Sequence, residues 1–300
     1  MNAIKARNPL NTLILFLAFF TLQGTALAFQ AQQEKSFLWE VSSTTATAYI
    51  LGSIHFANES FYPLDESIEK AFADSSQLVV EINPLTMDNQ KLQQLVVNNG
   101  LYRGDETIAD HIRPETLKRL NQHLDKNGIQ PELAYKMKPS LTAITLSTAQ
   151  LTRMGYSHEM GIDAYFCKKA TGNKAIIELE TMEEQLSLFF EMPDDELFLQ
   201  YTLNDLDNME RLFSHIVNAW KSGDESAMNK VLFKPFTNTP QLEPILSRVY
   251  YDRNSRMVSK IKEMLTKQQK VFIVVGAGHL VGEKGIIKML KNDNYTIRQL

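Results

Sequence analysis

The chain has 300 residues, 44% hydrophobic and 22% charged, which is ordinary for a globular protein that buries a large core. The formal net charge is −4 and no block of basic residues stands out, so we expect no nucleic-acid partner. Cys167 is the single cysteine, which excludes an intramolecular disulfide.

The first 28 residues have the pattern of a secretory signal peptide. Lys5 and Arg7 form a basic start, residues 12–22 form an apolar run, and residues 26–28 read Ala-Leu-Ala, a small-x-small cleavage site. The apolar run is about half as long as the roughly 20 residues that a membrane span needs. We predict a cleaved signal peptide over residues 1–28 and a periplasmic or secreted mature chain, with an uncleaved N-terminal anchor as the alternative. Because the sequence ends without a C-terminal apolar span, no stable membrane anchor is expected after cleavage.

The mature chain begins with a pattern of strands and one helix. Apolar runs at residues 37–42 and 47–55 are separated by a short polar stretch, which is typical of a hairpin. Residues 64–72 then follow a helical period, and residues 77–83 form a short buried strand. A strand–helix–strand unit of this length indicates a right-handed parallel crossover.

Helical patterns dominate the middle of the chain. They fill residues 105–170, and a buried strand is predicted at residues 175–179. Residues 193–269 carry no strong strand signal. Within them, an apolar stripe predicts a single amphipathic helix over residues 203–220, ended by Gly223.

The chain closes with a strand at residues 271–275, a helix, and a strand at residues 295–300. Strand signals therefore lie toward both ends, with helices between them. We predict one α/β domain over residues 29–300. Its core is a central, mostly parallel β-sheet formed by two pseudo-repeated halves, with a helical insertion over about residues 193–269 that would act as a lid.

Polar residues follow four of the predicted strands, and two of the strands end in the same Gly-x-x-His pattern. These residues are Gly52, His55, Glu81, Glu180, Gly276 and His279. In a parallel α/β sheet, ligands bind in the crevice outside the carboxyl ends of the strands. If the four strands are neighbours, these side chains meet at one rim. The two glycines would allow a sharp turn at positive φ or a close approach to a partner.

Two imidazoles and a carboxylate form a metal-ligating set. We predict that His55 and His279, with one or both of Glu81 and Glu180, bind a divalent metal, namely Mn, Co or Zn. The second carboxylate would serve as a general base beside a water that the metal acidifies, and which of Glu81 and Glu180 takes that catalytic role is left open. The alternatives are capped loop histidines and, for Glu180, a solvated strand edge. His158 is a further candidate.

The ordered motifs resemble the TraB/GumN (PrgY) family, which includes the Tiki metalloproteases. The motifs are "YILGSIHFA", "LVVEIN", "GIDAYFCKKA", "IIELETMEEQL", "YDRNSRM" and "VFIVVGAGHLVGEKGIIKML". This family is considered related in fold to the ChaN and erythromycin-esterase group. The resemblance covers about residues 37–300.

The resemblance implies that His55, His279 and Glu81 build a metal site in an α/β core. Arg253 would stabilise a developing oxyanion or pair with Glu180. Asp163 and Asn254 lie in the matched motifs and are further candidates. Tiki proteins are described as Mn- or Co-dependent proteases of secreted ligands, which implies a peptide or protein substrate.

Three functions are therefore open. The first is a metal-dependent hydrolase, specifically a peptidase. The second is a non-catalytic binder of haem, metal or a peptide signal, as ChaN-like proteins suggest. The third is a metal-free esterase that uses a histidine as general base.

Overall fold

The computed structural model describes residues 35–234, 236, 239–267 and 269–300. The predicted signal peptide lies outside these residues. Within them, no helix is both long enough and apolar enough to cross a membrane.

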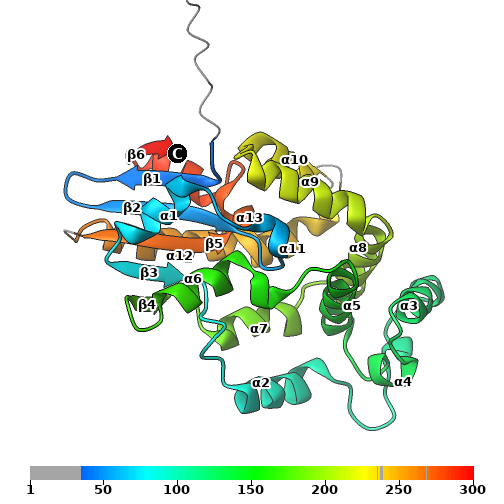
Figure 1. Ribbon diagram of the computed structural model, residues 1–300. Coiled ribbons are helices and arrows are strands. Elements are labelled where there is room, and N and C mark those ends of the chain that lie inside the picture. Colours follow the sequence, from blue (N-terminus) through cyan, green and yellow to red (C-terminus); the bar gives the residue numbers. More distant parts are fainter. Residues whose placement is uncertain (1–34, 235, 237–238, 268) are drawn as a thin grey trace, which may run out of the picture. The chain divides into compact units, whose positions relative to one another are not determined.

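A six-stranded sheet in the order β4-β3-β5-β2-β1-β6 forms the centre of the domain (Figure 1). The strands are β1 (Leu38–Ser42), β2 (Thr47–Ser53), β3 (Gln77–Val80), β4 (Ala175–Glu178), β5 (Lys270–Gly276) and β6 (Thr296–Gln299). Strands β4, β3, β5 and β2 are parallel neighbours, whereas β1 runs antiparallel to β2 and β6. The predicted hairpin, the parallel crossover and the mostly parallel sheet are thus confirmed.

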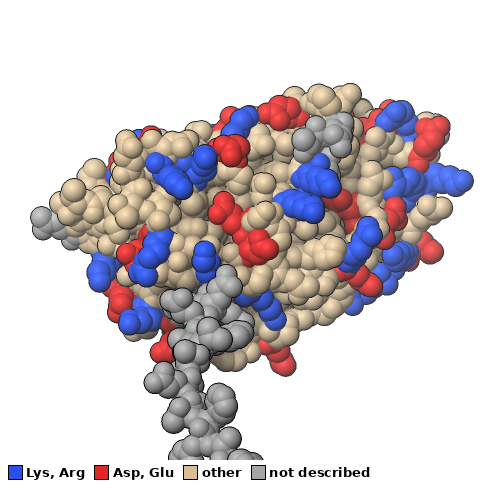
Figure 2. Space-filling view, turned by 90° about the horizontal axis from the view of Figure 1, so that it is seen from above, with Lys and Arg blue, Asp and Glu red and all other residues tan. Residues whose placement is uncertain are grey.

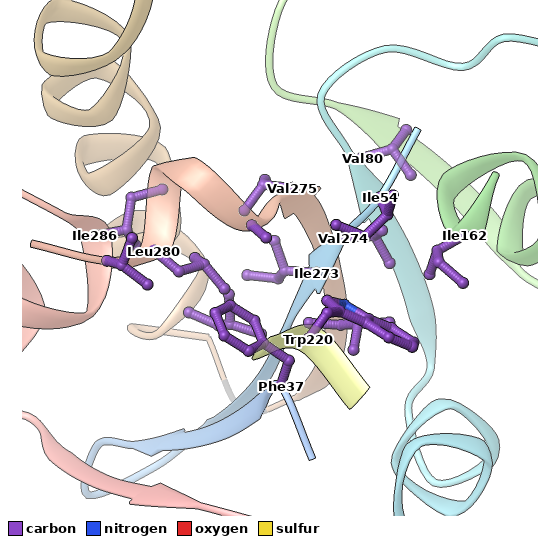
Figure 3. Close-up of a cluster of buried hydrophobic side chains, with 14 of the residues drawn as sticks. Phe37, Ile54, Val80, Ile162, Trp220, Ile273, Val274, Val275, Leu280 and Ile286 are labelled. Atoms are coloured by element: carbon purple, nitrogen blue, oxygen red, sulfur yellow. The ribbon is translucent and has the colours of Figure 1, made fainter. Parts of the chain in front are cut away.

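The inner strands are continuous apolar runs because helices cover both of their faces. Helix α1 packs against β2 and β5, and α6 packs against β3 and β4. Phe72, Phe166 and Phe272 join these helices to the sheet, with ring centroids 4.8–5.5 Å apart. Leu280 and Ile286 belong to the same core, and Figure 3 shows them in a buried cluster with Ile273 of β5.

Helices account for most of the remaining chain. The longer ones are α1 (Glu66–Ala73), α2 (Asn89–Leu95), α3 (Pro114–Lys126), α5 (Pro139–Arg153), α6 (Ile162–Ala170), α7 (Met182–Phe190), α8 (Asp195–Asp207), α9 (Met209–Lys221), α10 (Glu225–Phe233), α12 (Asp252–Met264) and α14 (Ile286–Asn292). Short ones include α4 (Pro131–Ala134), α11 (Glu243–Leu246), α13 (Ala277–Leu280) and the π-helical turns η2 (Val96–Gly100) and η7 (Ser247–Tyr251).

Two expectations about the chain's organisation need correction. The predicted helix over residues 203–220 is two helices, α8 and α9. They meet at Asn208, whose φ of −122° and ψ of 15° leave the helical region. Its side-chain amide donates to the Asn204 carbonyl (3.3 Å), a local bond that competes with the helix. The two pseudo-repeated halves are not confirmed: the strands of the two halves are mixed in one sheet, with β1 and β2 of the N-terminal half as neighbours.

The segment predicted as a helical insertion, residues 193–269, contains no strand among its described residues. Its α9 is tied to the sheet, because the Trp220 indole donates a buried hydrogen bond to the Gly52 carbonyl (2.6 Å). Residues 237–238, within the proposed lid, lie outside the described part of the chain, and the lid stays a prediction.

Replacing Trp220 with phenylalanine is expected to lower the free energy of unfolding by about 1–3 kcal/mol, because the buried Gly52 carbonyl loses its indole donor. Urea unfolding followed by circular dichroism measures this. Trp39→Phe is the matched control: Trp39 is 3% exposed, and its ring packs edge-on against Phe37 with 4.9 Å between the ring centroids. An equal loss in both variants would contradict the role of the hydrogen bond.

The surface seen from above carries basic and acidic side chains interspersed, without an extended patch of one sign on that face (Figure 2). This distribution agrees with the small net charge of −4.

Candidate functional site

The carboxyl ends of β2, β3, β4 and β5 lie at one edge of the sheet, because these four strands are parallel neighbours. His55 follows β2, Glu81 follows β3, and His279 lies in α13 directly after β5. These three side chains, with Arg253 and Gly276, line one cavity of about 280 Å³. The expectation that strand-end residues meet at a shared rim therefore agrees with the structure for His55, Glu81 and His279, but not for Glu180, which does not line the cavity.

The Glu81 carboxylate accepts three hydrogen bonds at the cavity. Its Oε1 accepts a hydrogen bond from the Gly276 backbone N–H (2.6 Å), and its Oε2 accepts from Arg253 Nη2 (2.6 Å) and Gln185 Nε2 (3.1 Å). Burial raises the pKa of Glu81, but the charges of His279, Arg253 and His55 and the Gly276 N–H outweigh it and lower the pKa to about 2. Arg253 is the partner that stays charged at neutral pH, so it holds Glu81 as a carboxylate.

Glu180 holds Arg253 from the other side. Arg253 Nε lies 2.9 and 3.1 Å from the two Glu180 carboxylate oxygens, and Nη2 lies 2.6 Å from Oε2. Burial lowers the pKa of Arg253, but Glu180 and Glu81 outweigh it and raise the pKa. Glu180 is 4% exposed and does not line the cavity, so it lies behind Arg253 and not at a solvated strand edge.

His279 is oriented by a relay of hydrogen bonds. Asn254 Nδ2 donates to the Lys284 carbonyl (2.8 Å), which leaves Asn254 Oδ1 to accept from His279 Nδ1 (2.6 Å). The proton is thus on Nδ1, and Nε2 carries the lone pair. The distance from His279 Nε2 to Glu81 Oε1 is 3.8 Å. Burial lowers the pKa of His279 to about 4, so the ring is neutral at pH 7.

His55 is oriented in the same way by Asp163 of α6. Its Nδ1 lies 3.1 Å from Asp163 Oδ1, which directs Nε2 toward the cavity. Burial lowers the pKa of His55, but Asp163 and Glu81 outweigh it and raise the pKa. Because the His55 side chain is 56% exposed, solvent screens part of the attraction to Asp163.

The space in front of Gly276 shows how well these donors suit a metal ion. A Cβ added to Gly276 would lie 3.3 Å from both Glu81 Oε1 and His55 Nε2, and 3.6 Å from His279 Cδ2. The two imidazoles and the carboxylate therefore surround one small opening, and they are suitable ligands in kind. Within the described part of the chain, however, no three His, Cys, Asp or Glu side chains are close enough to hold an ion as placed. Binding one would require the imidazoles to move toward Glu81 Oε1.

Of the remaining sequence-predicted residues, His158 and Gly52 do not line the cavity, whereas Gly276 does. His158 is in a short helical turn, with its ring 6.2 Å from that of Phe56. Neither Gly52 nor Gly276 has a positive φ, so the sharp-turn explanation is wrong for both. The close-approach explanation fits instead, because a Cβ on Gly52 would come 2.5 Å from the Phe37 ring.

The sequence patterns did not single out two residues that line the cavity, Ser53 and Tyr250. Ser53 ends β2, and its position two residues before His55 was an available signal. Tyr250 lies in the π-helical turn η7, with its ring centroid 5.2 Å from that of His279. The tyrosine pair Tyr250-Tyr251, in a helical pattern, gave no such signal.

The stability of the protein is expected to fall as the pH drops from about 4.5 to about 2. The Glu81 carboxyl has an ordinary pKa of 4.5 and a pKa of about 2 in the folded protein. Between these values the folded state binds fewer protons than the unfolded state, so acid removes the stabilisation. Urea unfolding at several pH values in this window should give a smaller slope for Glu81→Gln than for the wild type. Equal slopes would contradict the assignment.

A sequence profile of the TraB/PrgY/gumN family matches residues 37–299. "Uncharacterized protein YbaP" of Shigella flexneri is 26% identical over 246 residues, which is 81% of this chain and 88% of that protein. The protein of the same name from Escherichia coli (strain K12) is 26% identical over 81% of this chain and 87% of its own length.

A shorter similarity links the chain to a protein named for a proteolytic activity. "Metalloprotease TIKI homolog" of Amphimedon queenslandica is 37% identical over 60 residues, which is 19% of this chain and 12% of that protein. No solved structure matches the chain.

Proposed function

Because the chain belongs to the TraB/PrgY/gumN family, we propose that it is a metal-dependent hydrolase that cleaves peptides in the periplasm or outside the cell. The observation that carries the proposal is the small opening before Gly276, where a Cβ on Gly276 would lie 3.3 Å from Glu81 Oε1 and His55 Nε2 and 3.6 Å from His279 Cδ2. The partial similarity to a protein named as a metalloprotease supports the same reaction class.

His55, Glu81 and His279 would hold a divalent cation, namely Mn, Co or Zn. When bound, the cation would supply Lewis acidity toward water and a peptide carbonyl. The chain's own contribution is orientation. Asp163 turns His55 Nε2 and Asn254 turns His279 Nε2 toward the opening.

Arg253 and Glu180 have a positioning role in this proposal. Arg253 keeps Glu81 ionised and fixes its carboxylate, and both Glu81 and Glu180 neutralise the guanidinium. Glu180 is separated from the cavity by Arg253, so we propose that it holds Arg253 and does not move a proton. Arg253 likewise has little free charge left for an oxyanion.

The test is hydrolysis of a mixture of synthetic peptides, read by mass spectrometry. Protein stripped with chelator is incubated alone or with Mn²⁺, Co²⁺ or Zn²⁺, beside the double variant His55→Ala/His279→Ala. Cleavage that needs the metal and both histidines is expected. No cleavage under any condition would overturn the hydrolase, and undiminished cleavage by the double variant would overturn the site.

A metal-free hydrolase is the second candidate, and the hydrogen bond between His55 and Asp163 favours it. This pair, 3.1 Å apart, has the geometry of a general base with an orienting carboxylate. Full activity in the presence of chelator, lost on Asp163→Asn, would identify this function in place of the first.

A further inference from the structure

The cavity has two chemically different sides. The strand ends form a polar floor of His55, Glu81 and His279. A second part of the lining, the apolar wall, comes largely from α9, α10 and η7. Its side chains are Phe56, Phe213, Ile216, Met228, Leu232 and Val249, and the polar side chains of Tyr250 and Arg253 also line the cavity. A ligand that fills the cavity therefore meets both the polar strand-end side chains and the apolar wall.

Ser53 adds an unused hydrogen-bonding group to the same cavity. It is 2% exposed and lines the cavity, and its buried Oγ has no hydrogen-bond partner among the described residues. Ser53 is the register partner of Gly276 on the neighbouring parallel strand, so the two positions face the same side of the sheet. A Cβ built on Gly276 would lie 3.3 Å from Glu81 Oε1 and from His55 Nε2.

A buried hydroxyl without a partner is costly, and folded proteins rarely leave one. Among the described residues, the Ser53 hydroxyl makes no hydrogen bond that would stabilise the fold. A ligand with a polar backbone group would give the Ser53 hydroxyl a hydrogen-bond partner. The apolar wall would favour a ligand that carries an apolar side chain.

We propose that the cavity is a subsite for one apolar residue of a peptide. The residue's side chain packs against the apolar wall, and one of its backbone amide groups hydrogen-bonds Ser53 Oγ. The volume of about 280 Å³ is at the lower end for ligand sites, which suits a single residue better than a large cofactor. The proposal deepens the peptidase function, on which it rests, by naming the class of residue that the site accepts.

Calorimetric titration with two capped tripeptides, acetyl-Gly-Leu-Gly-amide and acetyl-Gly-Ser-Gly-amide, tests the subsite. With and without Mn²⁺, the wild type is expected to bind the leucine peptide at least about 10-fold more tightly than the serine peptide. Ser53→Ala should weaken both peptides by about 5-fold while leaving the melting temperature unchanged or higher, because the hydroxyl has no partner to lose. A lower melting temperature with unchanged affinity would show a structural role and overturn the assignment of Ser53.

Leu232 and Val231 of α10 provide a matched pair for the apolar wall. Leu232 lines the cavity, whereas Val231 lines a separate hollow between α9 and α10. Leu232→Ser should abolish the preference for the leucine peptide, and Val231→Ser should retain it. Equal effects of the two substitutions would contradict the wall.

The outcome is separable from that of the proposed hydrolase. If the wild type binds Mn²⁺ but binds the two tripeptides equally or not at all, the subsite is wrong and the metal site stands. If it prefers the leucine peptide without binding Mn²⁺, the subsite stands and the metal-dependent hydrolase is wrong.

Discussion

Replacing Arg253 with alanine is expected to lower the free energy of unfolding by about 3–5 kcal/mol, because it leaves a buried charge network without its cation. The guanidinium is the shared partner of Glu81 and Glu180, and all three side chains are at most 8% exposed. Without it, two carboxylates would stay buried side by side. Urea unfolding at neutral pH measures the loss.

Arg256 offers a matched control on the same helix. Its side chain is 51% exposed, and Nη2 lies 3.9 Å from Glu180 Oε1. Arg256→Ala should therefore change the free energy of unfolding by less than about 0.5 kcal/mol. Similar losses for the two arginines would contradict the buried-triad account.

Gly276→Ala is expected to weaken binding of a divalent metal by about 100-fold while leaving the fold intact. The added Cβ would occupy the opening, 3.3 Å from Glu81 Oε1 and His55 Nε2, where metal–ligand distances of about 2 Å leave no room for it. The backbone accepts alanine, since the φ of Gly276 is −52°. Calorimetric titration with Mn²⁺ and thermal unfolding give the two readouts.

Gly172→Ala should show the reverse result. Its φ is +77° and no atom lies within 4 Å of an added Cβ, so alanine is strained there without entering any site. We expect a loss of about 1 kcal/mol in stability with unchanged metal affinity. Weak metal binding by both variants would mean that the effect at Gly276 is not local.

The strands and the residues at their ends were predictable because burial leaves a direct mark on the sequence. β2, β3 and β5 are buried between helices, so each is a short, nearly continuous apolar run. A polar residue that ends such a run, as His55, Glu81 and His279 do, is conspicuous. Parallel packing then brings those ends to one edge, whatever the order of the strands.

The contacts between distant segments were not predictable in the same way. Arg253 lies 172 residues from Glu81 and 73 from Glu180, and no local pattern records that one guanidinium serves both. The break at Asn208 was missed because the apolar stripe continues across it, with Leu206 and Met209 both buried. Periodicity reports which face is buried, and a single poor helix residue does not interrupt it.

The central claim is that His55 and His279, 224 positions apart in the sequence, share one divalent metal ion with Glu81. Calorimetric titration of chelator-stripped protein with Mn²⁺ tests it most directly, with His55→Ala/His279→Ala beside a double control at two exposed histidines, His111→Ala/His215→Ala. The account predicts stoichiometric binding by the wild type and the control, and none by the first variant. Equal binding by all three proteins would contradict it.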